Sequence, residues 1–572
     1  MLNMNSSSPS GRRQIVNLLV DADTHQRLKA RLPTLPDICL THRQICDFEL
    51  LATGAFSPLT GFMTRVEYEG VLKRMRLPSE HLWPIPVTLD LLQDQAQSLR
   101  EGQSLVLRDP EGFPLGLLHI EDIWPADPRR EALAVYGTTD RSHDGVNALF
   151  QKEETHHVGG RVQALNLPIH SDFKQIRLTP GEVRDRMRKL GWKRMVGFQT
   201  RAPIHRPQFE LTLRAMEQAR ANLLLLPIAG IPQPGDFDHY TRMRCYQQMA
   251  AQYPPDTHLL NLLPLSMRLA GPRDALLHLI IGKNFGCTHF VIGHNHSSPG
   301  RDSQGQPFYT AEECAALAME AARELEIQPL VFDNMVYLPF EDEFRLTSEV
   351  ERGQDTLTLS NDDIRNRVRA GKQIPEWASF PQVIRELKNA YPAPSGQGFT
   401  IFLTGLSGAG KSTIARVLYS KFMEMGNRPV TLLDGDIVRH SLSSELTFSK
   451  EHRDINVRRI GFVASEITKN RGIAICAPIA PYAATRDQIR TTIEAHGGFF
   501  EIHVATPIAV CEKRDRKGMY AKAKAGLLKG FTGVDDPYEI PKAPELSIDT
   551  THLTPDEAVQ QILLMLSRKG YV

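Results

Sequence analysis

The chain has 572 residues, of which 41% are hydrophobic and 23% charged, and this length predicts three or four domains with full cores. Its 67 Lys and Arg residues nearly balance 66 Asp and Glu residues, which argues against a basic field for nonspecific nucleic-acid binding. The composition excludes collagen, coiled coil and disorder as the main type of structure. The apolar runs are too short to span a bilayer.

The first residues and the cysteines indicate a cellular compartment. The polar start has no apolar segment typical of a signal peptide, and we expect its first ten residues to fray. Seven cysteines are scattered without a C-x-x-C pair. This pattern predicts a cytoplasmic protein with reduced thiols, with neither a disulfide framework nor a zinc site.

Changes of sequence rhythm predict the domain order. Residues 1–170 mix short apolar alternations with Pro- and Gly-rich turns, which favours a β-rich domain with some helices. Residues 171–325 alternate helical stretches with runs such as MVGFQT, NLLLLPI and HFVIG, as in a parallel α/β sheet. A further segment, 326–390, ends in the helical PQVIRELKNAY, and a Pro- and Gly-rich linker follows at 391–398. A second α/β pattern fills 399–572.

A phosphate-binding loop opens this last segment. Residues 399–404 read as a buried strand, and GLSGAGKST follows, matching G-x-x-x-x-G-K-[ST]. The glycines allow a tight turn whose N–H groups point at phosphates, and the next helix presents its positive end there. Lys411 can reach the β- and γ-phosphates, and Ser412 can ligate Mg²⁺. The motif predicts nucleotide binding without naming the reaction.

Charged and aromatic residues after the loop narrow the chemistry. Asp434 and Asp436 follow an apolar run, where a carboxylate can hold Mg²⁺ or accept a proton from a hydroxyl. The residues that come next would suit a planar anionic ligand or single-stranded nucleic acid, and they would equally suit a solvated helix face. These are Arg439, Phe448, Arg453, Asn456, Arg458 and Arg459. The Lys- and Gly-rich segment 511–539 suits a mobile lid or a basic surface.

These motifs together resemble adenylylsulfate (APS) kinase. The segments that carry the resemblance are GLSGAGKST, DGDIVR, TFSKEHRDINVRRIGFVA, APIAPYAATRDQIR, CEKRDRKGMY and LLKGFTGVDDPYE. The family transfers a phosphate from MgATP to the 3′-hydroxyl of APS, giving PAPS and ADP. The resemblance implies catalytic roles for Asp436 and Lys411 and Mg²⁺ ligation by Ser412 and Asp436. It implies ATP binding by Gly405, Ser407, Gly408, Ala409, Gly410, Lys411, Ser412, Thr413 and Arg514, and APS binding by Arg439, Phe448, Arg453, Asn456, Ile479, Lys529 and Phe531.

One position departs from the kinase pattern. The family commonly has I-S-P-Y, whose serine has been proposed as a phosphorylated intermediate, and this chain has Ala480 in that place. Because alanine has no nucleophile, we expect direct in-line transfer from ATP to the hydroxyl.

Residues 15 to 390 resemble ATP sulfurylase of the kind fused to an APS-kinase-like domain. The segments CDFELLATGAFSPLTGFM, LWPIPVTLD, PGDFDHYTRMRCYQ and LPLSMRLAGPRDALLHLIIGKNFGCTHFVIG carry it. The resemblance implies a PUA-like domain, a Rossmann-like nucleotidyltransferase α/β domain and a C-terminal subdomain before the P-loop kinase α/β domain. The family joins ATP and sulfate into APS and pyrophosphate.

Both motifs that make the sulfurylase site are altered. The family patterns are Q-T-R-N-P-x-H-x-x-H and G-R-D-H-A-G-P-G. Here Ala202 replaces the Asn, Gln208 the second His, His294 the Arg and Asn295 the Asp, whereas Gln199, Arg201, His205 and His296 are kept. Losing one preorganised donor typically costs about 10²- to 10³-fold in rate, so we expect an inactive site.

We therefore predict an APS kinase with a silent sulfurylase-like region that still supports folding and assembly. A bifunctional PAPS synthase with a working sulfurylase is one alternative, and a protein that only senses PAPS is another. Intact Lys411 and Ser412 argue against the sensor. We expect ATP and APS as ligands, Mg²⁺ as cofactor, no nucleic acid, no membrane and a homo-oligomer, which in fused relatives is often a hexamer.

Overall fold

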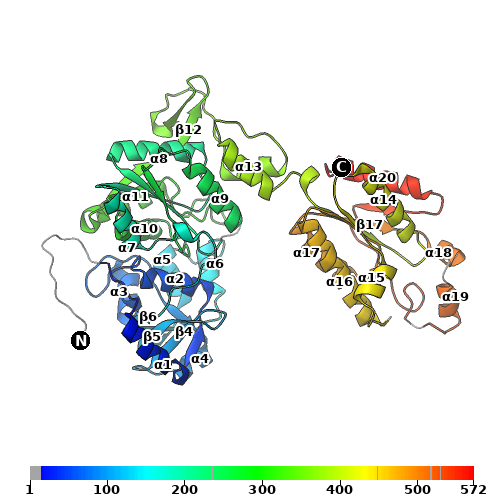
Figure 1. Cartoon of the computed structure of the whole chain (residues 1–572), viewed down its shortest axis with the longest axis horizontal. Helices are drawn as coiled ribbons and strands as arrows, with labels where there is room; N and C mark the ends of the chain where they lie inside the picture. The colour runs from blue at the N-terminus through cyan, green and yellow to red at the C-terminus, as the bar shows by residue number, and fades with distance from the viewer. Residues whose placement is uncertain (1–14, 233–235, 448, 516–517, 529) are drawn as a thin grey trace. The chain divides into compact units, whose positions relative to one another are not determined.

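The computed structural model describes residues 15–572 except 233–235, 448, 516–517 and 529. The side chains of residues 436, 437, 439 and 440 also lie outside the description. The chain divides into unit 1, Met1–Asp362 with Ile374–Glu386, and unit 2, Asp363–Gln373 with Leu387–Val572 (Figure 1). Among the helices of the described residues, none has the length and apolar character needed to cross a membrane.

A six-stranded sheet organises the first part of unit 1. Its order is β1-β4-β5-β6-β2, and β3 also pairs with β6; β1 and β4 are parallel and the other pairs antiparallel. The strands are β1 (Asp37–Cys39), β2 (Gly61–Phe62), β3 (Leu89–Leu91), β4 (Ser104–Arg108), β5 (Pro114–Pro125) and β6 (His156–Ala164). The helices are α1 (Ala22–Arg31), α2 (His42–Ala52), α3 (Arg65–Arg74), α4 (Gln93–Ser98), α5 (Pro128–Tyr136) and α6 (Asp144–Phe150).

A parallel five-stranded sheet organises the second part of unit 1, in the order β11-β10-β7-β8-β9. The strands are β7 (Met195–Thr200), β8 (Asn222–Pro227), β9 (His258–Leu260), β10 (His289–Gly293) and β11 (Gln328–Phe332). The helices are α7 (Pro180–Lys189), α8 (Arg206–Ala219), α9 (His239–Ala250), α10 (Pro272–Phe285) and α11 (Ala311–Leu325). The boundary predicted at residue 325 falls just before β11, an edge strand of this sheet. A hairpin of β12 (Met335–Leu338) and β13 (Glu343–Leu346) follows, and then α12 (Asn361–Arg369) and α13 (Pro381–Ala390).

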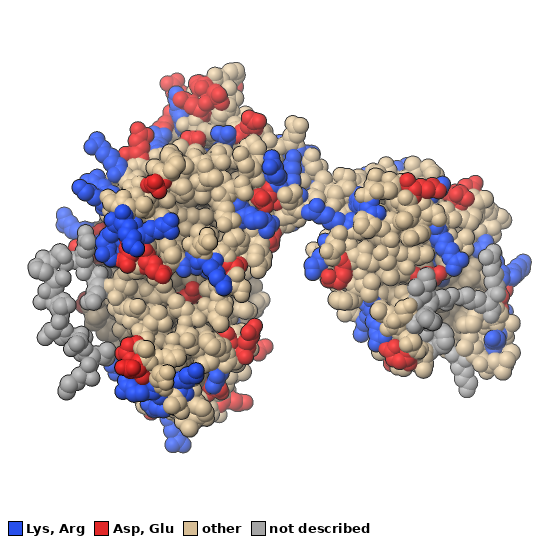
Figure 2. Space-filling view, viewed as in Figure 1, with Lys and Arg blue, Asp and Glu red and all other residues tan. Residues whose placement is uncertain are grey.

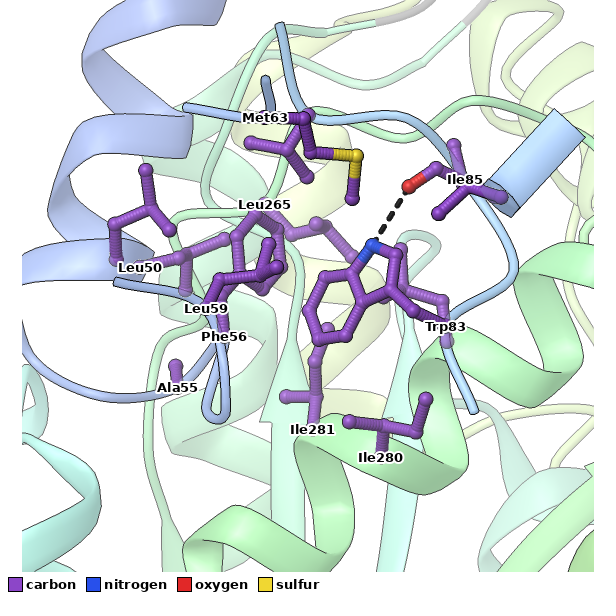
Figure 3. Close-up of a cluster of buried hydrophobic side chains, with 14 of the residues drawn as sticks. Leu50, Ala55, Phe56, Leu59, Met63, Trp83, Ile85, Leu265, Ile280 and Ile281 are labelled. Atoms are coloured by element: carbon purple, nitrogen blue, oxygen red, sulfur yellow. Dashed lines mark hydrogen bonds between the residues drawn. The ribbon is translucent and has the colours of Figure 1, made fainter. Parts of the chain in front are cut away.

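The two parts of unit 1 share one hydrophobic core (Figure 3). Phe56 and Trp83 pack edge to face, with ring centroids 5.5 Å apart, and Trp83 Nε1 donates to the Ile85 carbonyl at 2.7 Å. Ile280 and Ile281 on α10 pack into the same cluster (Figure 3). The first part is therefore built into the sulfurylase-like region and is not a separate module. On the face of unit 1 shown in Figure 2, acidic and basic side chains are interspersed.

Unit 2 is a parallel sheet in the order β15-β16-β14-β17-β18, with helices on both faces. One core joins the sheet to α14 and α20, and another joins it to α16 and α17. Figure 1 shows these two helix pairs on opposite sides of the sheet. The strands are β14 (Phe399–Thr404), β15 (Val430–Leu433), β16 (Ile473–Cys476), β17 (Gly498–Val504) and β18 (Leu546–Ile548). The helices are α14 (Lys411–Met425), α15 (Gly435–Leu442), α16 (Lys450–Lys469), α17 (Ala483–Glu494), α18 (Ile508–Arg514), α19 (Met519–Lys524) and α20 (Pro555–Arg568).

The predicted linker at 391–398 is fastened to the end of unit 2. It contains one short 3₁₀ turn, Pro394–Gly396. Tyr571 Oη donates to Gln397 Oε1 at 3.1 Å, and Arg428 donates to the Tyr571 carbonyl at 3.0 Å and also to the Gln397 carbonyl. The segment that enters the domain and the last residues of the chain therefore meet at one place.

Candidate active site

The loop between β14 and α14 forms the predicted phosphate cradle. Gly405 and Gly410 have φ values of 148° and 107°, and a Cβ on Gly405 would lie 2.5 Å from the Val504 carbonyl oxygen. Gly410 is the N-cap of α14, so the positive end of that helix meets the loop. Lys411 Nζ donates to the Gly405 and Leu406 carbonyls at 2.9 and 2.8 Å. These bonds keep its ammonium group within the loop.

A cavity of about 770 Å³ opens beside this loop. One side of its lining comes from the loop, with Ser407, Gly408, Gly410, Lys411, Ser412 and Thr413. Arg453, Asn456, Ile479, Arg514 and Phe531 line it as well. Described residues from the set predicted for ATP and from the set predicted for APS therefore face the same space. Gly405 and Ala409 are buried.

The residues present fit a hard divalent cation. Ser412 Oγ donates to Asp434 Oδ1 at 3.1 Å, and Asp434 is the N-cap of α15. A hydroxyl and a carboxylate oxygen are the ligand types that Mg²⁺ prefers alongside water and phosphate. The backbone of Asp436 lies in the first turn of α15, but its side chain lies outside the described part of the chain.

The guanidinium group of Arg453 ties three segments together. Its Nη1 donates to Thr532 Oγ1 at 2.8 Å, and its Nη2 lies 3.0 Å from Asp536 Oδ2. Tyr482 Oη donates to the two carboxylate oxygens of Asp536 at 3.0 and 2.9 Å. Burial raises the pKa of Tyr482 to about 12, and the hydrogen bond to Asp536 is the second contribution in the same direction. The phenol is therefore a hydrogen-bond donor at neutral pH.

Two polar atoms in this wall are buried and have no hydrogen-bond partner among the described residues. Arg453 Nε, a donor, and Asn456 Oδ1, an acceptor, have no hydrogen bond among the described residues. Because an unsatisfied buried polar group costs about 1–3 kcal/mol, both atoms point to a polar ligand in the cavity. The two residues lie one helical turn apart on α16.

Phe531 forms an aromatic part of the lining. It is 7% exposed, and its ring packs edge to face on Tyr520 with centroids 5.0 Å apart. Asp535 accepts hydrogen bonds from the backbone N–H groups of Gly530 and Phe531, which close the turn that carries this ring. Phe448 and Lys529 lie outside the described residues, and so does the side chain of Arg439, whose backbone lies in α15.

Ala480 lies where the kinase pattern has serine. It lines the cavity, is 1% exposed and has a φ of 46°, in the left-handed region. Thr404 Oγ1 donates to the Ile479 carbonyl at 2.7 Å and contacts the Ala480 carbonyl at 3.3 Å. These contacts from β14 hold the segment in a conformation that L-residues seldom adopt.

The two sulfurylase-like motifs follow neighbouring parallel strands. The first begins on β7 and continues to α8, and the second follows β10, which pairs with β7. Both motifs therefore start at the carboxyl edge of the sheet, where ligands bind in open α/β sheets. Arg201 Nε lies 3.6 Å from Asp236 Oδ1, while Arg201 Nη1 is buried and has no hydrogen bond to a described residue. Gln199 Nε2 lies 3.8 Å from Met267 Sδ.

His205 and Gln208 have structural partners. The His205 ring is 2% exposed, and its Nδ1 lies 2.7 Å from Ser379 Oγ. Burial lowers the pKa of His205 to about 4, so the ring is neutral at pH 7. Gln208 Oε1 accepts a hydrogen bond from the His205 backbone N–H at 3.2 Å and thereby caps α8. The Ala202 carbonyl accepts a hydrogen bond from Tyr246 Oη at 2.9 Å.

The second motif places its histidines differently. His294 and Asn295 are exposed, and His294 Nδ1 lies 3.9 Å from Asp333 Oδ1. His296 Nε2 lies 2.9 Å from Nδ1 of the buried His278, which fits one shared hydrogen. Burial lowers the pKa of His296 to about 4 and that of His278 well below its usual range. Two neutral imidazoles therefore pair with each other.

Comparisons with known proteins cover the whole chain. Family models match residues 7–167 as a PUA-like domain, 174–390 as ATP-sulfurylase and 397–549 as adenylylsulphate kinase. A sulfate adenylyltransferase of Aspergillus terreus is 45% identical over 99% of both chains, and one of Mycosarcoma maydis is 44% identical over 97% of this chain and 98% of its own. A solved structure, the hexameric APS kinase from Thiobacillus denitrificans, is 42% identical over 98% of both chains with a TM-score of 0.78.

This chain belongs to the family of fused ATP-sulfurylase and APS kinase proteins. The fold expected from its motifs is confirmed: unit 2 holds the P-loop APS kinase domain, and unit 1 holds the PUA-like domain and most of the ATP-sulfurylase domain. The residue roles and the domain boundaries expected from the sequence stay predictions.

Several residues of both sites had no role in the sequence-based prediction. In the APS kinase domain these are Thr506, Thr532, Asp536 and Thr550, and Tyr482 as the partner of Asp536. In the ATP-sulfurylase domain they are His278, Asp333 and Ser379. The motif FTGVDDPYE contained a signal for Asp536, since a carboxylate beside a predicted ligand-binding aromatic is a candidate partner for a nearby arginine.

Proposed function

We propose that this protein phosphorylates the 3′-hydroxyl of APS with MgATP, giving PAPS and ADP. The observation that carries the proposal is the single cavity lined by the P-loop and by Arg453, Asn456 and Phe531. Arg453 Nε and Asn456 Oδ1, which have no hydrogen bond to the part of the chain that the structure describes, supply a donor and an acceptor for a polar ligand there. A phosphate cradle and a second ligand wall in one cavity are what a phosphotransferase needs to align donor and acceptor.

The chain supplies positioning and charge stabilisation. Loop N–H groups and Lys411 would hold the ATP phosphates, and Asp436 would accept the proton of the attacking 3′-hydroxyl. A bound Mg²⁺, with oxygens from Ser412 and Asp434 in reach, would neutralise charge on the β- and γ-phosphates. Ala480 in the cavity supports direct transfer, since it offers no hydroxyl to form a phosphoenzyme.

We further propose that the ATP-sulfurylase domain is catalytically silent. Adenylyl transfer develops charge on the α-phosphate and on pyrophosphate, which cationic donors must stabilise. Of the eight residues predicted for that site, His205 and His296 are neutral at pH 7, Gln208 caps a helix and Ala202 has no donor. Arg201 carries the one guanidinium group among these eight predicted residues, and its Nε lies 3.6 Å from Asp236 Oδ1.

A bifunctional PAPS synthase is the second candidate, because the similar relatives are named sulfate adenylyltransferase. Purified protein supplied with Mg²⁺, APS and pyrophosphate separates the two by release of sulfate from APS, because a working APS kinase would consume the ATP formed with it. The same preparation must convert APS and ATP into PAPS, which proves that it is folded. Pyrophosphate-dependent sulfate release above background would establish the bifunctional enzyme. A preparation that binds ADP in titration calorimetry, and is therefore folded, but makes no PAPS would refute the kinase and leave the PAPS sensor as the remaining alternative.

We also propose a homo-oligomer. The support is the Thiobacillus denitrificans structure, which is described as hexameric and covers 98% of this chain. Light scattering coupled to size-exclusion chromatography tests this: a mass near six times 64.3 kDa is expected for a hexamer, and a monomer mass would refute the oligomer.

A further inference from the structure

A pair of threonine hydroxyls holds one carbonyl of the phosphate-binding loop. Thr506 Oγ1 and Thr550 Oγ1 lie 3.0 and 2.9 Å from the Ala409 carbonyl oxygen, and 2.8 Å from each other. All three residues are buried. Thr506 comes two residues after β17 and Thr550 two residues after β18, so both hydroxyls project from the carboxyl edge of the sheet beside β14.

The other partners of the two hydroxyls limit the direction of these bonds. Thr550 Oγ1 accepts from Arg514 Nη1 at 2.8 Å, and Thr506 Oγ1 accepts from the Thr550 backbone N–H at 3.2 Å. Each hydroxyl has one hydrogen, so at least one of the two donates to the Ala409 carbonyl, and the other donates either to that carbonyl or to the neighbouring hydroxyl. Arg514 Nη2 also donates to the Thr550 carbonyl at 2.8 Å, which fixes Thr550 by two parallel bonds.

This arrangement sets the orientation of the next N–H group. A trans peptide is planar, so its C=O and N–H point in opposite directions. When two hydroxyls hold the Ala409 carbonyl on one side, the Gly410 N–H is turned to the other side. Gly410 lines the cavity and is the N-cap of α14, where loop N–H groups bind phosphate.

We propose that Thr506 and Thr550 are positioning residues for the ATP side of the site, and that Arg514 acts on the P-loop through Thr550. The proposal rests on the proposed kinase function. It assigns Arg514 a role in shaping the loop that is independent of any contact between its guanidinium face and the nucleotide. The three residues together would determine the affinity for ATP and leave the affinity for APS unchanged.

Isosteric substitutions test the hydroxyls one at a time. We expect T550V to raise the KM for ATP and the Kd for ADP, measured by titration calorimetry, roughly tenfold, since one charge-assisted buried bond is lost. The KM for APS should stay within twofold. T550S keeps the hydroxyl and should restore both constants to within twofold of the parent. T506V and T506S form a second pair that keeps the test open if T550V does not fold.

Two further variants sharpen the result. T491V removes a hydroxyl that bonds the Asp487 carbonyl on α17, away from the cavity lining, and should change none of these constants. The R514A/T550V double variant should lose less than the product of its two single losses, because both act on one network.

Unchanged ATP and ADP constants in T550V and T506V would overturn the proposal, and multiplicative losses would overturn the role of Arg514. A parent protein that binds ADP but makes no PAPS would refute the kinase function alone. The ADP constants would then still test the threonines.

Discussion

The neutral His205 makes a quantitative prediction about stability. Burial lowers its pKa to about 4, against about 6.5 in an unfolded chain. Between these two pKa values the imidazole of His205 therefore binds a proton in the unfolded state but not in the native state. Stability rises with pH wherever the unfolded state binds more protons, so this residue must lower the free energy of unfolding as pH falls from about 6.5 to 4.

The size of the effect follows from the two pKa values. One such histidine should remove about 2 kcal/mol from the free energy of unfolding at pH 5 and about 3 kcal/mol at pH 4, relative to pH 8. His205→Asn is the matched perturbation, since an amide can keep the bond to Ser379 Oγ without a titrating ring. Ser379→Ala is the control, because it removes the partner and leaves the imidazole in place.

Urea unfolding of unit 1, followed by its buried tryptophans, measures the difference. Between pH 8 and pH 5 we expect the parent and S379A to lose about 2 kcal/mol more than H205N does. Equal losses in the parent and H205N would mean that His205 is already protonated in the native protein. That result would remove one of the arguments for a silent ATP-sulfurylase domain.

Three predictions concern the APS kinase domain. Lys411→Ala should lower kcat/KM for PAPS formation by about 10²- to 10³-fold, as for loss of one preorganised donor. Asp536→Asn should cost roughly tenfold in kcat/KM for APS, because Arg453 loses its counter-charge and orientation; Thr491→Val, away from the cavity lining, should leave kcat/KM for APS unchanged. Labelled ATP should leave no phosphoenzyme, and Ala480→Ser should keep PAPS formation within about twofold, whereas a labelled parent protein would contradict direct transfer.

Local sequence patterns predicted the parallel sheets well. MVGFQT, HFVIG and FTIFLT coincide with β7, β10 and β14, because buried parallel strands are continuous apolar runs. The sheet of residues 37–164 was predicted only as β-rich. Its two- and three-residue strands β2 and β3 pair with β6 about 70 to 100 residues away, and no local period encodes such pairing.

In the candidate sites, too, local features were predictable from the sequence and contacts between distant residues were not. The P-loop was predictable because glycine spacing, strand and helix are all local in the sequence. The bond from Thr550 to Ala409 joins residues 141 positions apart, and the pair of His205 with Ser379 spans 174. Threonine and serine are common in every sequence, so only the fold identifies the ones that matter.

The bond between Tyr571 and Gln397 has a consequence for engineering. Since the domain's entry and exit lie side by side, the APS kinase domain is a cassette whose ends already meet. A few residues would close it into a ring, which could be reopened at the exposed turn of Gly426 to give a circular permutant with the P-loop untouched. By the same geometry, the cassette could be inserted into a surface loop of another protein without separating the host's flanking residues.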